Sequence, residues 1–137
     1  MEIGTGYFAK ARNYADAGYA LVSIALKDPW FLPSTLKMHK LPELAPTEEI
    51  LGLRLNPEVY KEEYFKQILK SPLEIYSKIY AIAQEEKKDK VALLCYESPE
   101  KFCHRHLVAR WLSNHIGCTV KEIELNSQES LFDSDSF

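Results

Sequence analysis

The sequence predicts an α/β fold: a single three-layer, Rossmann-like domain with a mainly parallel sheet of about four strands. Two short segments, 19–26 and 91–96, are continuously apolar, as strands covered on both faces are. Apolar residues at helical spacing lie between them, and alternation of buried strands with helices is typical of parallel sheets. The 137 residues suffice for one core, which we expect within residues 1–126.

The composition argues against several classes of protein. Lys and Arg number 17 against 20 Asp and Glu, so nucleic acid is a possible but not a favoured partner. The sequence lacks a run of about 18 apolar residues and a start typical of signal peptides, so we expect a cytoplasmic protein without membrane contact. Three cysteines, an odd number, predict reduced thiols. No oligomeric state follows from the sequence.

The first part of the chain predicts a strand, a helix and a second strand. Residues 2–5 form the first strand, and the apolar series from Tyr7 to Ala15 has helical spacing. Gly18 ends this helix, because glycine readily adopts the left-handed conformation common at helix C-termini. The second strand is the apolar run 19–26.

The middle of the chain predicts a long connection and then two helices. Residues 27–47 contain four prolines without sustained periodicity, which is typical of a functional loop or lid. One helix begins at Asn56 and Pro57, and the next begins at Ser71 with a capping-box pattern to Glu74. The residues expected to line the buried face of the second helix are Leu73, Tyr76, Ile79, Tyr80 and Ala83.

The last part of the chain predicts a strand, a helix and an edge strand. The charged residues 84–90 indicate a solvated helix end before the strand. A helical stripe then runs from Leu107 to Ile116 and ends at Gly117, and residues 118–125 alternate as an edge strand does. Residues 127–137 hold three acids and no base, which predicts a disordered tail, with a docking peptide as the alternative.

The predicted topology places the site at one edge of the sheet. In parallel sheets, ligands bind beyond the carboxyl ends of the strands, where successive loops converge. The loops concerned are 4–7, 27–30 and 97–105. We therefore expect the functional residues in these three segments.

Arg105 is the first candidate for binding an anion. It follows a buried strand and lies at the start of a helix, where free amides and the helix dipole favour negative charge. Its guanidinium fork suits phosphate or carboxylate. The alternative is that Arg105 pairs with Glu97 or Glu100 and braces the loop.

Cys103 is the candidate nucleophile, with His104 as its base or orienting group. The alternative is a small packed cysteine, as we expect for Cys95. We expect His104 to lean toward the core and to hydrogen-bond a backbone group. A metal site that uses both His104 and His106 is not predicted, because side chains two apart on a helix diverge by about 200°. No cofactor is predicted.

The other candidate residues lie in the first two loops. Gly4 and Gly6 would let the backbone approach a ligand closely, with the Thr5 hydroxyl as a donor. The aromatic residues that would stack on a base, or pack in the core as the alternative, are Tyr7, Trp30 and Phe31. The lysines expected to give the rim a positive field are Lys10, Lys27 and Lys101.

Four segments together resemble one known family. They are IGTGYFAKA at 3–11, LVSIAL at 21–26, LAPT at 44–47 and ALLCYESPEKFCHRHLVARWL at 92–112. The sequence resembles the domain of unknown function 488 family (DUF488), which implies a Rossmann-like single domain of bacterial, archaeal or viral origin. The motif positions that the resemblance carries over are Leu94, Cys95, Tyr96, Glu97, Cys103, His104 and Arg105, with Thr5, Pro46 and Thr47 as secondary matches.

The chain also departs from the pattern of this family. Many members have a histidine in the first loop and an acid plus an arginine after the second strand. Here these places hold residues 4–6 (GTG) and 23–25 (SIA). The departure fits a neutral binding pocket better than an acid and base pair.

We expect a small cytosolic protein that binds a phosphorylated or nucleotide-like ligand at the carboxyl edge of its sheet. The ligand-binding candidates are Thr5, Gly6, Tyr7, Trp30, Thr47, Tyr96, Glu97 and Arg105. The first alternative is a cysteine-dependent hydrolase or transferase for a nucleotide or nucleic-acid-derived substrate, with Cys103 and His104 catalytic. The second alternative is an interaction module that docks through its acidic tail.

Overall fold

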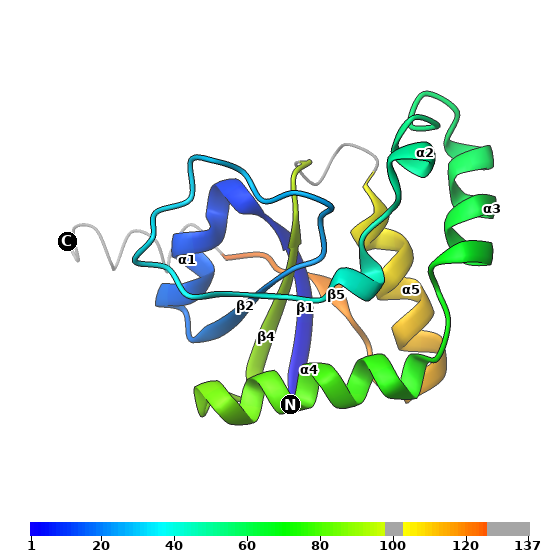
Figure 1. Ribbon diagram of the computed structural model, residues 1–137. Helices are drawn as coiled ribbons and strands as arrows, with labels where there is room; N and C mark the ends of the chain where they lie inside the picture. Colours follow the sequence, from blue (N-terminus) through cyan, green and yellow to red (C-terminus); the bar gives the residue numbers. More distant parts are fainter. Residues whose placement is uncertain (98–102, 126–137) are drawn as a thin grey trace.

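The chain forms a five-stranded parallel sheet with helices on both faces, as the computed structural model shows for residues 1–97 and 103–125 (Figure 1). The strand order is β3-β2-β4-β1-β5. The strands are β1 (Glu2–Tyr7), β2 (Tyr19–Ser23), β3 (Met38–Lys40), β4 (Lys90–Cys95) and β5 (Lys121–Glu122). The helices are α1 (Ala11–Asp16), α2 (Glu48–Leu51), α3 (Pro57–Gln67), α4 (Pro72–Glu86) and α5 (His104–Ile116), with 3-10 turns at Phe8–Lys10 and Pro42–Leu44.

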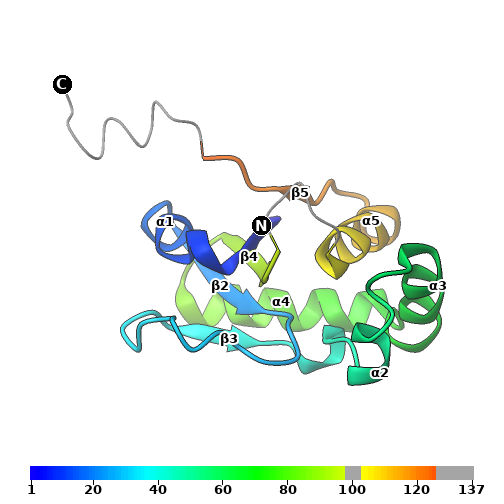
Figure 2. The same ribbon diagram turned by 90° about the horizontal axis from the view of Figure 1, so that it is seen from above.

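The two faces of the central strand β4 pack against different layers. Val91, Leu93 and Cys95 belong to the core beneath α4 and α5, whereas Ala92 and Leu94 belong to the core beneath α1. All five are buried, which explains why this strand has a continuous apolar sequence. Seen from above, α1 and α5 lie on opposite sides of the strands (Figure 2). The predicted three-layer α/β fold is confirmed.

The register of the central strands places three loops at one edge. Leu94 of β4 is paired with Gly6 of β1 and with Ser23 of β2. Because all three strands are parallel, their carboxyl ends lie at the same edge, opposite the N-terminus in Figure 1. The loops that follow β1, β2 and β4 therefore begin side by side at this edge of the sheet.

The predicted connection 27–47 is less irregular than expected. It contains β3, which pairs with β2, and it is followed directly by α2. The signal for α2 was present, since Thr47 precedes two glutamates; its Oγ1 accepts a hydrogen bond from Ile50 N at 3.1 Å. Strand β2 ends at Ser23 rather than Leu26, because Ser23 Oγ accepts from Ala25 N and donates to Asp28, which turns the chain.

Asn56 and Ser71 stand at the N-cap positions of α3 and α4 as predicted, but the predicted caps by their side chains are wrong. Neither side chain caps its helix, and Ser71 has a φ of 54°, in the left-handed region. The predicted first-turn prolines, Pro57 and Pro72, do start these helices, because a proline at the first helical position is pre-set for helical φ.

Two residues predicted to line the buried face of α4 are exposed. Leu73 is 70% exposed and Tyr80 is 49% exposed. The residues four apart that do reach the core are Ile75, Ile79 and Ala83. The first of these was missed.

The last strand is shorter than the predicted edge strand 118–125. Strand β5 covers two residues at the sheet edge beside β1, and Cys118 is exposed before it. Gly18 and Gly117 have positive φ and follow their helices as predicted. The tail predicted at 127–137 lies outside the described residues. In the part of the chain that the structure describes, no helix has both the length and the apolar character needed to cross a bilayer.

Candidate functional site

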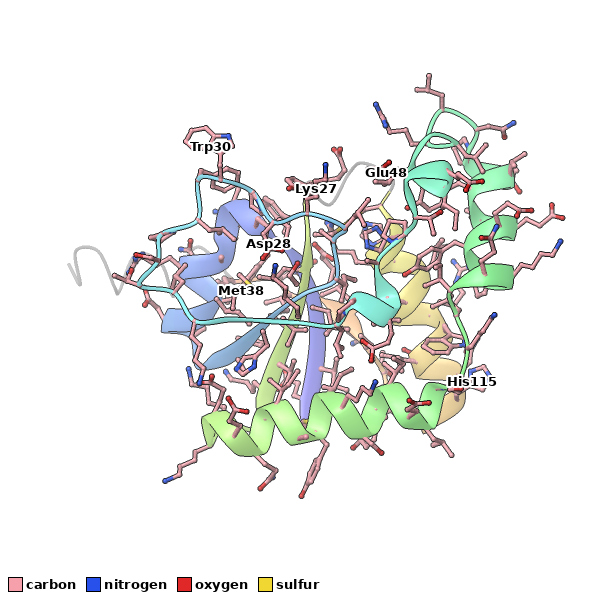
Figure 3. The ribbon with its side chains drawn as sticks, viewed as in Figure 1. Lys27, Asp28, Trp30, Met38, Glu48 and His115 are labelled. Carbon is pink, nitrogen blue, oxygen red and sulfur yellow. A yellow bond between two sulfur atoms is a disulfide. The ribbon has the colours of Figure 1, made fainter. Side chains whose placement is uncertain are left out.

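A cleft lies at the carboxyl edge of the sheet, beyond β2 and β4. It consists of two adjoining cavities of about 430 and 310 Å³, which share Leu51, Arg54, Tyr96 and His104. The larger cavity also meets the loop after β2, and the smaller also meets Cys95 and Cys103. Figure 3 shows Lys27 and Glu48, which line the larger cavity, at this edge of the molecule. The prediction of three converging loops holds for those after β2 and β4.

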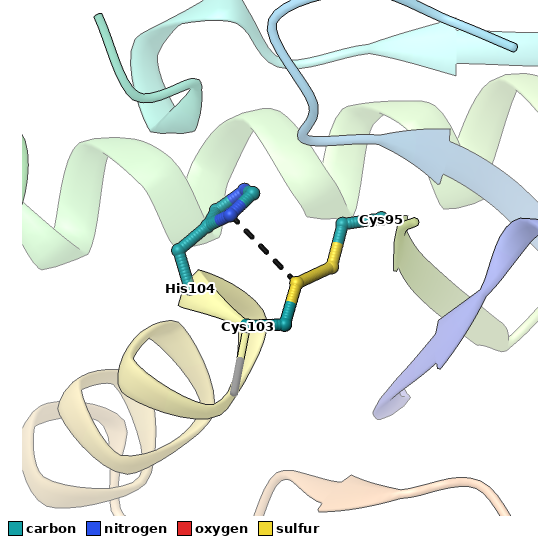
Figure 4. A group of neighbouring side chains, drawn as sticks. All are labelled: Cys95, Cys103 and His104. Atoms are coloured by element: carbon teal, nitrogen blue, oxygen red, sulfur yellow. Dashed lines mark hydrogen bonds between the residues drawn. A yellow bond between two sulfur atoms is a disulfide. The ribbon is translucent and has the colours of Figure 1, made fainter. Parts of the chain in front are cut away.

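The strand and helix on either side of the cleft bring Cys95, Cys103 and His104 together (Figure 4). Cys95 is the last residue of β4, and Cys103 is the extended residue before α5, with a φ of −151°. His104 is the first residue of α5, whose N-cap makes no side-chain hydrogen bond. The helix therefore begins beside the sulfur atoms with its amide end toward them.

His104 is fixed by a backbone carbonyl on the neighbouring strand loop. Its Nε2 lies 2.7 Å from the carbonyl oxygen of Ile24, which can only accept, so Nε2 carries the proton. Its Nδ1 lies 3.8 Å from Cys103 Sγ. Burial lowers the pKa of His104 from 6.5 to about 4, which leaves Nδ1 as a free acceptor at neutral pH. The predicted backbone hydrogen bond is confirmed.

The packing around His104 holds the ring in this orientation. The ring of Tyr64 lies against it with centroids 5.5 Å apart. Tyr64 is fully buried and donates its hydroxyl proton to Leu44 O at 2.6 Å. A helix outside the sheet thus supports the imidazole from one side.

Cys95 and Cys103 are joined by a disulfide, so the prediction of reduced thiols is wrong for these two residues. The sequence separation of 8 did not reveal that the end of β4 and the start of α5 bring the sulfur atoms together. Cys118 is free and exposed. Cys95 is fully buried in the core, as predicted.

Arg105 is buried and is occupied by protein groups. Its Nε and Nη2 each lie 3.0 Å from an oxygen of Glu122, and its Nη1 lies 3.1 Å from Cys95 Sγ. Its side chain is fully buried. The guanidinium therefore joins α5 to β5 and to the end of β4, and its nitrogens face protein groups instead of an anionic ligand. The alternative of an internal ion pair is correct in kind, although the acid is Glu122. Within the described residues Glu97 forms no ion pair with Arg105, and Glu100 lies outside those residues.

Three residues of the first loop that were predicted to bind the ligand do not line the cleft. Thr5 is buried and donates its hydroxyl proton to Glu122 at 2.8 Å. A Cβ at Gly6 would lie 2.5 Å from the Tyr14 ring, so Gly6 makes room for a protein side chain. Tyr7 lines a separate cavity of about 220 Å³. Thr5 and Gly6 therefore serve contacts within the protein, and Tyr7 lies at a cavity apart from the cleft.

Two further predicted residues lie outside the two cavities. Trp30 is 94% exposed and points away from the molecule (Figure 3). Its ring lies near that of Phe31. Thr47 caps α2 and lines an adjoining cavity of about 300 Å³. Of the predicted rim lysines, Lys10 lines the separate cavity, Lys27 lines the cleft, and Lys101 lies outside the described residues.

Four predicted residues do meet at the cleft: Tyr96, Glu97, Cys103 and His104. The Tyr96 hydroxyl donates to Lys27 O at 2.5 Å, which ties the loop after β2 to the end of β4. Burial, together with the carboxylate of Asp28, raises the pKa of Tyr96, so this donor keeps its proton.

Leu51 and Arg54, which line both cavities, are among the residues of the cleft wall that sequence reasoning missed. They lie about thirty residues after β2 and bear no local signal for an edge position. Only the fold, which brings α2 over the carboxyl edge, places them there. Within the described residues, neither Arg54 nor Lys27 forms an ion pair with an acid.

Two groups of side chains have the donor types that metal ions take. Cys95, Cys103 and His104 offer ligand atoms within 4.8 Å of one another, as do His39, Glu85 and Glu86. Bonded sulfurs are not thiolates, so the first group would need reduction before it could hold an ion. In the second group, His39 Nε2 already lies 2.6 Å from Glu86, and Lys37 pairs with both acids.

Comparisons with known proteins identify one family. The family model DUF488-N3a, described as the active DUF488-N3 subclade, matches residues 26–116, which is more than half of the chain. The match covers every residue that lines the cleft except Ala25, and it includes the segment that links β4 to α5. Neither the curated proteins nor the solved structures gave a match.

Proposed function

The chain belongs to the DUF488 family, and from this membership and the cleft we propose that it is a cysteine-dependent hydrolase or transferase. Its substrate would be a phosphorylated or nucleotide-like small molecule. The observation that carries the proposal is the approach of His104 Nδ1 to Cys103 Sγ in the cleft wall. The description of the matching subclade as active supports an enzyme.

In the reduced protein, His104 Nδ1 accepts a hydrogen bond from the Cys103 thiol and takes its proton as the sulfur attacks the substrate. The imidazole is neutral, its Nε2 proton is held by Ile24, and its Nδ1 lone pair faces the sulfur. The start of α5 adds oriented amides, which favour a thiolate at its N-cap position. A neutral base, an orienting carbonyl and a helix N-terminus together form the arrangement that activates a cysteine nucleophile.

The walls of the cleft support a substrate with an anionic and a flat apolar part. Lys27 and Arg54 supply positive charge, which Glu48 at the same cavity offsets in part. Leu51 and the ring of Tyr96 supply apolar surface on which a base could lie. The volume of about 430 Å³ is in the range of small-molecule sites.

The proposed site differs from the residue set predicted from the sequence. It retains Tyr96, Cys103 and His104 and adds Arg54 as the cation in place of Arg105. Arg105 is excluded because its nitrogens contact Glu122 and Cys95. In this proposal the anion therefore binds to Arg54 in the cleft wall and not to Arg105 at the start of α5.

Alkylation of the fully reduced protein tests the proposal. Cys103 and Cys118 are quantified as iodoacetamide adducts by peptide mass spectrometry, with and without AMP or pyrophosphate. We expect Cys103 to react, AMP or pyrophosphate to slow that reaction several-fold, and the exposed Cys118 to be unaffected. The protection should be lost in a Lys27→Gln, Arg54→Gln double variant and kept in Lys10→Gln, whose lysine lines the separate cavity.

Two outcomes would contradict the proposal. One is a Cys103 that stays unmodified in the folded, reduced protein while Cys118 is alkylated. The other is a Cys103 rate that neither phosphate compound changes and that the double variant leaves as it was.

A further inference from the structure

The Cys95–Cys103 bridge joins the end of β4 to the residue before α5, at the wall of the cleft. Both cysteines line the smaller cavity of the cleft, together with Arg54 and His104; Cys95 is fully buried, and Cys103 keeps a small exposed fraction of 6%. A bridge in the wall of a cavity can be reached by small oxidants and reductants. Oxidation or reduction of the bridge therefore changes the chemical groups that the cleft offers to a substrate.

Each sulfur of the bridge has a separate polar partner. Cys103 Sγ faces His104 Nδ1, and Cys95 Sγ receives an N–H from Arg105 at 3.1 Å. A bonded sulfur is a weak acceptor, whereas a thiolate gains considerably from a cationic donor. The surroundings are thus suited to both residues as thiols or thiolates and not only to the bridge.

The donor to Cys95 is held rigidly. Two nitrogens of Arg105 contact Glu122, whose Oε1 also accepts the Thr5 hydroxyl proton. Arg105 is fully buried, so its remaining N–H group keeps its direction toward Cys95. The ion pair that removes Arg105 from substrate binding therefore gives it a different role.

We propose that Cys95 and Cys103 form a reversible redox couple, in which a hydroperoxide oxidises Cys103 and Cys95 resolves the product. The proposal rests on the proposed function in one respect, namely that Cys103 is the reacting nucleophile. It adds a role for Cys95, which the proposed reaction does not use. The disulfide is the oxidised form of the site, and the dithiol is the form that reacts with substrate.

The chemistry balances in two steps. The Cys103 sulfur attacks one peroxide oxygen, an S–O bond forms, the O–O bond breaks, and the leaving alkoxide takes the thiol proton through His104, giving a sulfenic acid and an alcohol. The Cys95 sulfur then attacks the Cys103 sulfur, an S–S bond forms, the S–O bond breaks, and hydroxide leaves with the Cys95 proton as water. One hydroperoxide is reduced by two electrons, and a dithiol reductant returns the pair to thiols.

A thiol count on the full-length protein tests the couple without reference to any substrate. The protein is reduced anaerobically, given one equivalent of hydrogen peroxide, and assayed for thiols and intact mass. We expect three thiols to fall to one, with the loss of two hydrogen atoms in mass and a peptide that joins Cys95 to Cys103. Dithiothreitol should restore three thiols in the folded protein.

Variants assign the steps to residues. In Cys118→Ala the count should fall from two to none, because the exposed cysteine takes no part. In Cys95→Ser the sulfenic acid should persist at Cys103 and be trapped by a 1,3-diketone. Since Cys95 is fully buried, that variant is compared only if its circular dichroism matches the wild type, and the wild-type thiol count stands without it.

Three results would overturn the couple. One is that all three thiols remain after peroxide treatment. Another is that the Cys118 thiol is oxidised before the Cys103 thiol and the protein forms dimers. A third is that dithiothreitol reduces the bridge only after the protein is unfolded. Reduced protein that retains one equivalent of zinc and resists peroxide would also overturn it, in favour of a metal site. The proposed function can fail while the couple holds, because AMP protection and peroxide oxidation are separate measurements.

Discussion

His104 donates its Nε2 proton to the carbonyl oxygen of Ile24 across 2.7 Å, and this contact links the first residue of α5 to the chain just after β2. The two residues are 80 positions apart in the sequence. Because Nε2 holds the proton, the other ring nitrogen faces Cys103 as an acceptor. One hydrogen bond thus sets both the tautomer and the direction of the group proposed as the base.

Acid should destabilise the protein through His104. Its pKa is about 4 in the folded chain and 6.5 when unfolded, so between these values the unfolded chain binds a proton that the folded chain does not. Stability should therefore fall as the pH is lowered from 6.5 toward 4, by up to roughly 3 kcal/mol from this residue. Urea unfolding of wild type and His104→Gln at pH 7 and pH 4.5 checks this. An equal loss in both proteins would contradict it.

Replacement of Arg105 by methionine should be strongly destabilising. The variant leaves Glu122 and the Thr5 hydroxyl in a partly buried network without their cation. We expect a loss of roughly 3 kcal/mol in the free energy of unfolding. The matched control Arg110→Met, on an exposed position of the same helix, should cost less than about 0.5 kcal/mol. Comparable losses in the two variants would show that the buried pair contributes little.

Gly6→Ala should destabilise through packing and not through a ligand. The added Cβ would lie 2.5 Å from three atoms of the buried Tyr14 side chain, which would have to move. We expect a loss of about 2 kcal/mol, measured by chemical unfolding. Combining Gly6→Ala with Tyr14→Leu should cost less than the sum of the single losses. Additive losses would contradict the contact.

Most strands and helices could be predicted from the sequence because their signals are local. Residues 91–95 are apolar throughout and buried on both faces of the sheet, so composition alone identified β4, although the predicted run continued to Tyr96, which is exposed. Gly18 and Gly117 mark helix ends through their own backbone conformation. Strand β3 was missed because three half-exposed residues, 38–40, carry no apolar pattern of their own.

The site could be predicted only in part, because its decisive contacts join distant segments. The adjacency of Cys103 and His104 is visible in the sequence, and so is the helix start. That Arg105 pairs with Glu122, and that Arg54 reaches the cleft, depends on the placement of β5 and α2 against α5 and β4. Proximity to a helix N-terminus indicated an anion site, but burial of the guanidinium decided against it.

The charge of the cleft should select among alkylating reagents. Lys27 and Arg54 line the cavity that leads to His104, so the anion iodoacetate should modify reduced Cys103 faster, relative to neutral iodoacetamide, than it modifies Cys118. The ratio of the iodoacetate rate to the iodoacetamide rate at Cys103 should fall several-fold at high salt and in the double variant Lys27→Gln, Arg54→Gln. A ratio that is the same at both cysteines under all conditions would argue against an anionic substrate.

The most direct test of the account is the alkylation rate of Cys103 at pH 7 in reduced wild type and in His104→Gln. The glutamine amide can still donate to Ile24, but it offers no imidazole nitrogen to the sulfur. We predict that the Cys103 rate falls by about tenfold, while the rate of Cys118 in the same sample stays unchanged. An unchanged Cys103 rate in a folded His104→Gln protein would contradict the claim that His104 activates this cysteine.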